Sequence, residues 1–327
     1  MQLRYVTPAG VEIGQPPDLA DWRRRRDGYL WLDLPACDDV ASAMLRDGFG
    51  FQPQSINACR QRSHLPIYHR YEDHWFVVVH RPLVGRAGHV HLLQLEQFIG
   101  RDALVTLHGP YNPDVDPREV GQDTEALRGL LDSGRLLPKT PSELSHALVA
   151  GLSREYGDVL GGVASRVADL EQHVMNDDLR HPEELLERMF LIRHELVTIC
   201  TMAGHAYEIF ERMGGLSVRP TLDDRSLMAD LSDRFRRVRN IGDGERDFLT
   251  GVIDFYQTRT ATKMTVAMER LAVLAAVTLP ITALASVYGM NVIVNESTNL
   301  LQLAIALGVM VIISSLLLRW TKRHGWW

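Results

Sequence analysis

Two long apolar runs near the C-terminal end of the chain lack the charged face of an ordinary amphipathic helix. The first covers 20 uncharged residues from Leu271 to Met290, and the second covers 19 from Leu300 to Leu318. A helix of about 18 or more mainly apolar residues spans the roughly 30 Å hydrocarbon core of a bilayer. The pattern therefore predicts an integral membrane protein with transmembrane helices over 271–290 and 300–318. A buried hairpin in a soluble protein is the less favoured alternative.

The charges around the two runs predict a topology. The loop over 291–299 has no Lys or Arg and one acid, Glu296, whereas basic residues flank the other end of each run. Short loops rich in Lys and Arg stay on the cytoplasmic side. We therefore expect cytoplasmic N- and C-termini, an outer loop and a basic tail over 319–327. The flanking basic residues are Arg259, Lys263, Arg270, Arg319, Lys322 and Arg323.

The rest of the chain divides by its periodicity into three further regions. Residues 1–135 show short runs rich in Val, Leu and aromatics, which predict a mixed α/β domain. Residues 136–221 carry apolar side chains every three or four positions, which predicts helices over about 142–174 and 183–213. A third helix, over 222–290, has no Pro before Pro280 and continues into the first span as a stalk of roughly 100 Å. The expected strands cover 29–34, 75–80, 91–99 and 103–108.

Composition narrows the functional classes. A formal charge of −6 gives no indication of nucleic-acid binding. No apolar signal-peptide core lies near the start of the sequence, so we expect the N-terminal part to stay in the cytoplasm. Cys37, Cys59 and Cys200 form no CxxC pair, which suits packing in a reducing compartment. Phosphate-binding loops and catalytic motifs are absent from the sequence, so we expect neither ATP use nor an enzyme nor an enzymatic cofactor.

Two spans in one chain cannot enclose an aqueous path by themselves. A transporter of this kind therefore needs a ring of identical chains around a symmetry axis. Thr278, Thr282 and Ser286 follow one another at intervals of four and form a polar stripe on the first span. The stripe has two interpretations, lining of a pore or packing against another helix, because Ser and Thr serve both purposes in membranes.

The end of the first span carries a specific motif. Gly289-Met290-Asn291 follows Tyr288, and Pro280 lies nine residues before Gly289. In these features, in the basic, Trp-ended tail and in the order of its regions, the chain resembles the CorA family of magnesium transporters. The resemblance implies an α+β cytoplasmic domain, a long helical stalk, two C-terminal transmembrane helices and a funnel-like homopentamer in the plasma (inner) membrane. It implies a passive channel for Mg²⁺, with Co²⁺ or Ni²⁺ as further cargo.

The resemblance also assigns roles along the first span. A ring of Asn291 side chains, backed by the carbonyl of Gly289, would accept hydrogen bonds from hydrated Mg²⁺, which sheds its water reluctantly. Met290 would pack rather than coordinate. Further inward we expect Ser286 and Thr282 to continue the polar path. Apolar rings would follow and gate the pore by dewetting, at Leu279, Leu271 and Met268.

Two departures from the family pattern concern cations outside the pore. The outer loop lacks the usual Met-Pro-Glu-Leu stretch, so only Glu296 remains to recruit cations there. The resemblance places a regulatory acidic pair at Asn57-Ala58, where Asn57 can still supply an oxygen to a metal and Ala58 cannot. The stalk partner of that pair is retained as Asp254, but the replacement of the pair itself puts feedback control through this site in doubt. Asp230 and Asp233 are alternative regulatory ligands, and each of these acids is otherwise a solvated or ion-paired surface group. His89 and His91, at strand-like spacing, form a weaker metal candidate without an identifiable third ligand.

Two other functions remain open. A zinc transporter of the ZntB type has the same architecture, and Met290 favours magnesium over it only weakly. A membrane-anchored sensor or scaffold would use the hairpin as an anchor without transport. Loss of ion flux on changing Asn291 would exclude the anchor, and zinc uptake driven by a proton gradient would identify the zinc carrier.

Overall fold

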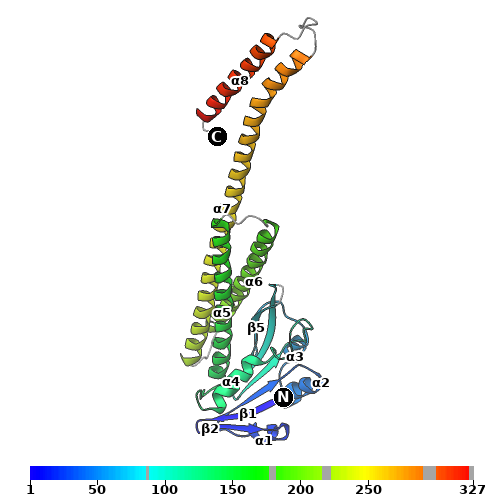
Figure 1. The fold of residues 1–327 in the computed structure, drawn as a ribbon. Coiled ribbons are helices and arrows are strands. Elements are labelled where there is room, and N and C mark those ends of the chain that lie inside the picture. Colours follow the sequence, from blue (N-terminus) through cyan, green and yellow to red (C-terminus); the bar gives the residue numbers. More distant parts are fainter. Residues whose placement is uncertain (86–87, 177–181, 216–221, 290–299, 324–327) are drawn as a thin grey trace. The chain divides into compact units, whose positions relative to one another are not determined.

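The structure is a computed structural model that describes residues 1–85, 88–176, 182–215, 222–289 and 300–323. The chain forms two compact units, Met1–Val252 and Ile253–Trp327. The first contains a sheet and a group of long helices, and the second contains the apolar helices. Figure 1 shows these elements along the chain.

The sheet of the first unit has seven described strands in the order β2-β1-β3-β7-β6-β5-β4. β3 and β7 are parallel, and all other neighbours are antiparallel. The four strands expected from the sequence are confirmed, while β1, β2 and β4 were not predicted. The strands are β1 Gln2–Thr7, β2 Gly10–Gly14, β3 Tyr29–Leu34, β4 Ile67–Arg70, β5 His74–Val84, β6 Val90–Gly100 and β7 Ala103–His108.

Both faces of the sheet are covered, which is why every residue of β3 is buried. Leu30, Leu32 and Leu34 share one core with short helices that precede and follow β3 in the chain. The alternate residues Tyr29 and Asp33 point to the other face, which α4 and α5 cover. The short helices are η1 Pro16–Asp18, α1 Leu19–Trp22, α2 Asp39–Ala43, η2 Met44–Gly48 and α3 Pro53–Cys59.

The long helices of the first unit follow the expected periodicity. α4 covers Gln122–Asp132, α5 covers Pro141–Met175 and α6 covers Pro182–Gly215. α5 begins where expected because the Thr140 hydroxyl accepts a hydrogen bond from the Glu143 amide and Pro141 occupies the first turn. The apolar stripes of the helices meet in one core, where the Phe235 ring of α7 lies against Tyr156 of α5 and Phe210 of α6.

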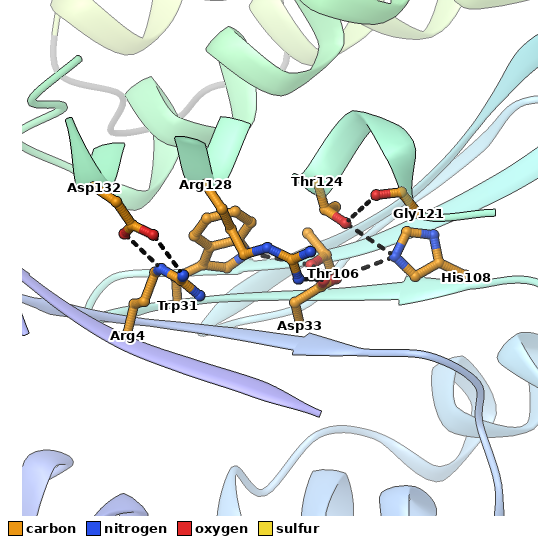
Figure 2. A network of polar contacts seen from close by, with 9 residues as sticks. All are labelled: Arg4, Trp31, Asp33, Thr106, His108, Gly121, Thr124, Arg128 and Asp132. Carbon is orange, nitrogen blue, oxygen red and sulfur yellow. Dashed lines mark hydrogen bonds and ion pairs between the residues drawn. The ribbon is translucent and has the colours of Figure 1, made fainter. Parts of the chain in front are cut away.

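A buried polar network joins α4 to the sheet (Figure 2). At its centre Asp33, 7% exposed, accepts hydrogen bonds from Thr106 at 2.7 Å and from Arg128 at 3.1 Å. His108 lies 3.2 Å from the same carboxylate. At the far end of α4, Arg4 and Asp132 form a bidentate ion pair at 2.8 and 2.9 Å. Sequence periodicity gave no indication of this network, because its members come from three strands and a helix.

One continuous helix, α7 Leu222–Gly289, leads from the first unit into the second, as expected, and contains Pro280. α8 covers Leu300–Arg323 and so extends past the expected end at Leu318. The predicted architecture of an α+β domain, a long helix and two C-terminal apolar helices is confirmed.

Candidate ion pathway

The second unit contains two apolar elements, the C-terminal part of α7 and the helix α8. Each contains a stretch long and apolar enough to cross a membrane, and only 6% of each stretch is buried. The core helix of a soluble protein would instead be mostly covered. Apolar helices that stay exposed need another covering, which a bilayer or further chains supply.

One side of α7 is the better covered in this unit. Val273 is 6% exposed, and Val277, Pro280, Ile281 and Leu284 are partly covered. Successive residues of an α-helix are turned by about 100°, so these five positions fall within an arc of about 100°. On α8 the most covered position is Thr321, 1% exposed. The two helices of the hairpin therefore each turn one side inward.

The predicted pore residues lie on the opposite side of α7. Met268, Leu271, Leu279, Thr282 and Ser286 share an arc of about 80°, centred roughly 170° away from the covered arc. All five are exposed, with 65% exposure for Leu271 and 66% for Leu279. Ala275 and Gly289 fall within the same arc by their spacing, and Thr278 widens it to about 100°. Ala275 was not predicted as a pore residue, although the helical period alone places it there.

The hydroxyl groups of Thr278 and Thr282 are hydrogen-bonded to their own helix in the single chain. Thr278 donates to the carbonyl of Leu274 and Thr282 to the carbonyl of Thr278, both at 2.8 Å. Such bonds satisfy the donor but leave hydroxyl lone pairs free to accept a further hydrogen bond. The arc therefore presents acceptors, which suit a hydrated cation.

Basic residues are kept away from this arc. Arg259, Lys263 and Arg270 lie within about 40° of one another on the helix, and their mean direction is roughly 130° from the centre of the arc. Within the described part of α7 in the second unit, the arc itself holds no charged residue between Met268 and Gly289. A cation that follows the arc is thus not opposed by a lysine or arginine on it.

The expected selectivity residues lie at the limit of what the structure describes. α7 ends at Gly289, where the motif begins. Met290, Asn291 and Glu296 lie outside the described residues. Their roles stay predictions from the sequence.

The position expected for the regulatory acidic pair has a mixed charge environment. Asn57 is exposed near the end of α3, and a shallow depression beside it is lined by Asp39, Arg46 and Arg60. Arg60 forms an ion pair with Asp39 across this depression. Two guanidinium groups oppose a dication in this place, and the one carboxylate is already paired. Asn57 as a metal ligand therefore gains no support from its surroundings within one chain.

The two acids on the first part of α7 are engaged in ion pairs. Asp230 accepts hydrogen bonds from His146 at 2.7 Å and from Arg234 at 2.6 Å. Burial raises the pKa of Asp230, but these two hydrogen bonds outweigh it and hold the pKa below its ordinary value. Asp233 pairs with Arg236 at 2.7 Å. Asp254 is exposed on the second unit. Within one chain Asp230 and Asp233 are thus already paired with basic side chains.

The histidine pair does not share a strand. β6 begins at Val90, so His89 lies outside it, and the expectation of two imidazoles on one strand face is wrong. The His89 ring instead lies edge-on to His194 of α6, with 6.3 Å between ring centroids. No group of three metal-binding side chains occurs in the part of the chain that the structure describes.

Comparison with known proteins identifies the family. The sequence profile of the CorA-like Mg²⁺ transporter protein family matches residues 26–323. The chain belongs to this CorA-like family. Members of the family are transporters of divalent cations in membranes and not enzymes, so the expected class of function is confirmed.

Two curated relatives cover most of the chain. A putative metal ion transporter of Bacillus subtilis, YfjQ, is 25% identical over 288 residues, which are 86% of this chain and 82% of that protein. The cobalt/magnesium transport protein CorA of Thermotoga maritima is 21% identical over 248 residues, 74% of this chain and 67% of that protein.

Solved structures agree on the fold. The complete CorA magnesium transporter of Methanocaldococcus jannaschii matches with a TM-score of 0.82 at 16% identity and covers 100% of this chain and 99% of its own. The ZntB cytoplasmic domain of Vibrio parahaemolyticus matches with a TM-score of 0.62 at 10% identity, over 80% of this chain and 98% of its own. At these identities the likeness concerns the fold alone.

Proposed function

We propose that this CorA-like protein is a passive Mg²⁺ channel built from five identical chains, with Co²⁺ or Ni²⁺ as further cargo. The observation that carries the proposal is the exposed arc on α7. Apolar residues occupy its first part and hydroxyl residues most of its second part, without a charge, and basic residues lie elsewhere on the helix. In a ring of five chains this arc would face the symmetry axis.

The chemistry of the arc suits an ion that keeps its water. Mg²⁺ binds six oxygens in a tight octahedron and gives up water slowly. Neutral acceptors such as the Asn291 amide, the Ser286 and Thr282 hydroxyls and the backbone carbonyl of Gly289 would hold the water shell without trapping the ion. Rings of Leu279, Leu271 and Met268 would form dewetted constrictions toward the cytoplasmic end. Glu296 would raise the local concentration of cations at the outer mouth.

Direction and driving force follow from the charges. With both termini in the cytoplasm, the basic residues flanking each span lie inside and the loop over 291–299 lies outside. An inside-negative potential of 100 mV favours entry of a divalent ion by about 4.6 kcal/mol. Uptake would need no ATP and no bound cofactor. We do not assign a regulatory metal to Asn57, and Asp230, Asp233 and Asp254 stay candidates for one between chains.

The test is Mg²⁺ uptake into proteoliposomes that contain a Mg²⁺ indicator, under an inside-negative potential. We expect uptake by the unchanged protein, loss of uptake in Asn291→Ala and near-normal uptake in the matched control Asn295→Ala, which removes an amide from the same loop. Equal uptake by both variants would contradict the Asn291 ring. The assembly is checked separately in detergent, where the particle mass should be five times the 36.9 kDa of one chain.

A zinc carrier is the second candidate, because the fold is shared with the ZntB cytoplasmic domain and so leaves the transported ion open. It predicts Zn²⁺ uptake that requires a proton gradient and little Mg²⁺ uptake. The anchor hypothesis predicts no flux of any divalent ion. The same proteoliposomes distinguish the three by changing only the external ion and the pH gradient.

A further inference from the structure

Two of the three cysteines lie together beside α3. Cys37 is half-buried in the connection between β3 and α2, and its sulfur lies 3.7 Å from the carbonyl of Ile56. Cys59 ends α3, is 2% exposed and donates to the carbonyl of Ser55 at 3.3 Å. The carbonyls of residues 55 and 56 are neighbours in α3, so both sulfurs lie against the same turn of this helix, and each thiol shifts the pKa of the other. Cys37 and Cys59 therefore form a pair of neighbouring thiols.

The two thiols differ in access and in polarity. Ser42 lies 3.5 Å from the Cys37 sulfur, and the Ser42 hydroxyl in turn accepts a hydrogen bond from Arg60 at 3.1 Å. Interaction with the Cys59 thiol lowers the pKa of Cys37 to about 6 against the effect of burial, and Ser42 and Arg60 lower it further. The interaction with Cys37 and burial both raise the pKa of Cys59. An accessible thiolate beside an enclosed thiol is the arrangement of a redox-active cysteine with its resolving partner.

The third cysteine provides an internal contrast. Cys200 is buried in the middle of α6, where its sulfur packs against Gly242 of α7. Burial raises its pKa to about 11. It has no second thiol beside it in the described part of the chain, so it should stay reduced under conditions that oxidise the other two.

We propose that Cys37 and Cys59 form a reversible dithiol–disulfide site that reacts with low-molecular-weight disulfides such as glutathione disulfide. The Cys37 thiolate attacks one sulfur of the small disulfide, whose S–S bond breaks and releases one thiolate. The Cys59 sulfur then attacks the Cys37 sulfur of the mixed disulfide and releases the second thiolate. Two electrons pass from the protein to the small disulfide, and the two protons of the cysteines end on the two released thiols.

The disulfide would have a local structural consequence. It would tie the end of α3 to the segment that joins β3 to α2, and so close a loop from Cys37 to Cys59 that contains α2, η2 and α3. Closing a loop restricts the open states through which amides exchange. We therefore expect slower hydrogen exchange in α3 in the oxidised protein. The proposal concerns this site alone and does not depend on which ion the protein transports.

The test uses the full-length protein in detergent, incubated with glutathione disulfide, acid-quenched, alkylated and mapped by mass spectrometry. We expect a Cys37–Cys59 cross-link, an alkylated Cys200 and full reversal by dithiothreitol. In Cys59→Ser the glutathione adduct should accumulate on Cys37, whereas Cys37→Ser should leave Cys59 unmodified. Cys200→Ser is the matched control and should react as the unchanged protein does.

Two outcomes would overturn the proposal. One is unchanged protein that carries a lasting glutathione adduct, or no modification at all, in place of the cross-link. The other is preferential modification of Cys59 or Cys200. The mass-spectrometric map of modified cysteines in the unchanged protein is enough to show either outcome. The test of the proposal therefore does not depend on whether a variant folds.

Discussion

Replacement of Asp33 by asparagine should destabilise the first unit strongly, because this carboxylate is the centre of the network in Figure 2. Asparagine keeps the shape but has one acceptor oxygen, whereas Asp33 uses both oxygens, one for Thr106 and His108 and one for Arg128. A hydrogen bond to a charged partner contributes about 1.5–3 kcal/mol, and the loss of one member of a buried ion pair costs about 3–5 kcal/mol. The Arg128 side chain is 19% exposed and so recovers some hydration. We expect a loss of about 2–3 kcal/mol.

Hydrogen exchange on the full-length protein in detergent measures this loss at the strands concerned. A loss of about 2–3 kcal/mol accelerates exchange of the β3 and β7 amides by about 30- to 150-fold. Asp102→Asn is the matched control, since Asp102 pairs with Arg26 at 3.4 Å while 42% exposed, and it should change exchange by about twofold or less. If the two variants exchange alike, the network does not hold α4 to the sheet as argued.

The same carboxylate predicts a pH dependence with a definite sign. Burial raises the pKa of Asp33, but hydrogen bonding and charge from His108, with a hydrogen bond from Thr106, outweigh it and lower the pKa. A depressed pKa contributes stability that is present above the ordinary value of about 4 and is lost as the pH falls toward the folded-state value. The protection of β3 and β7 should therefore decline on acidification in the unchanged protein and decline less in Asp33→Asn.

Three further predictions concern other parts of the chain. Burial raises the pKa of Glu96 to about 8, so the stability of the protein should decline as the pH rises from about 5 to 8. In Glu96→Gln the dependence of stability on pH should be weaker. Thermal unfolding across that range measures this dependence, and an unchanged slope in the variant would contradict the assignment. Arg166→Met should lower the free energy of unfolding by about 3 kcal/mol, because it leaves the fully buried Glu195 unpaired. Adding Glu195→Gln in the same chain should restore much of the melting temperature. No recovery in this double variant would count against the ion pair. Leu271→Ala should raise basal Mg²⁺ flux in proteoliposomes by widening an apolar constriction, whereas Leu316→Ala on the exposed side of α8 should not, and equal effects would remove Leu271 from the pathway.

The membrane hairpin and the long helices could be predicted from the sequence because their signals are local. An uncharged run from Leu271 to Met290 and a stripe of apolar residues at every third or fourth position identify a helix without knowledge of its neighbours. Strands β3 and β7 could also be predicted, since both are buried on two faces and are therefore mostly apolar. The half-exposed strands β2 and β4 carry no such run and were missed.

The sequence determines which residues share one side of α7, and the tertiary structure determines which side of α7 is exposed. Helical spacing alone puts Met268, Leu271, Leu279, Thr282 and Ser286 on one side of α7, because the turn per residue is constant. Which side of α7 its hairpin leaves open is a matter of packing, and the covered position at Val273 decides it. The contacts that join distant segments, such as Asp33 with Arg128 and Cys37 with Cys59, could not be predicted. These contacts depend on how segments tens of residues apart come together in the fold, and local sequence patterns carry no information about this arrangement.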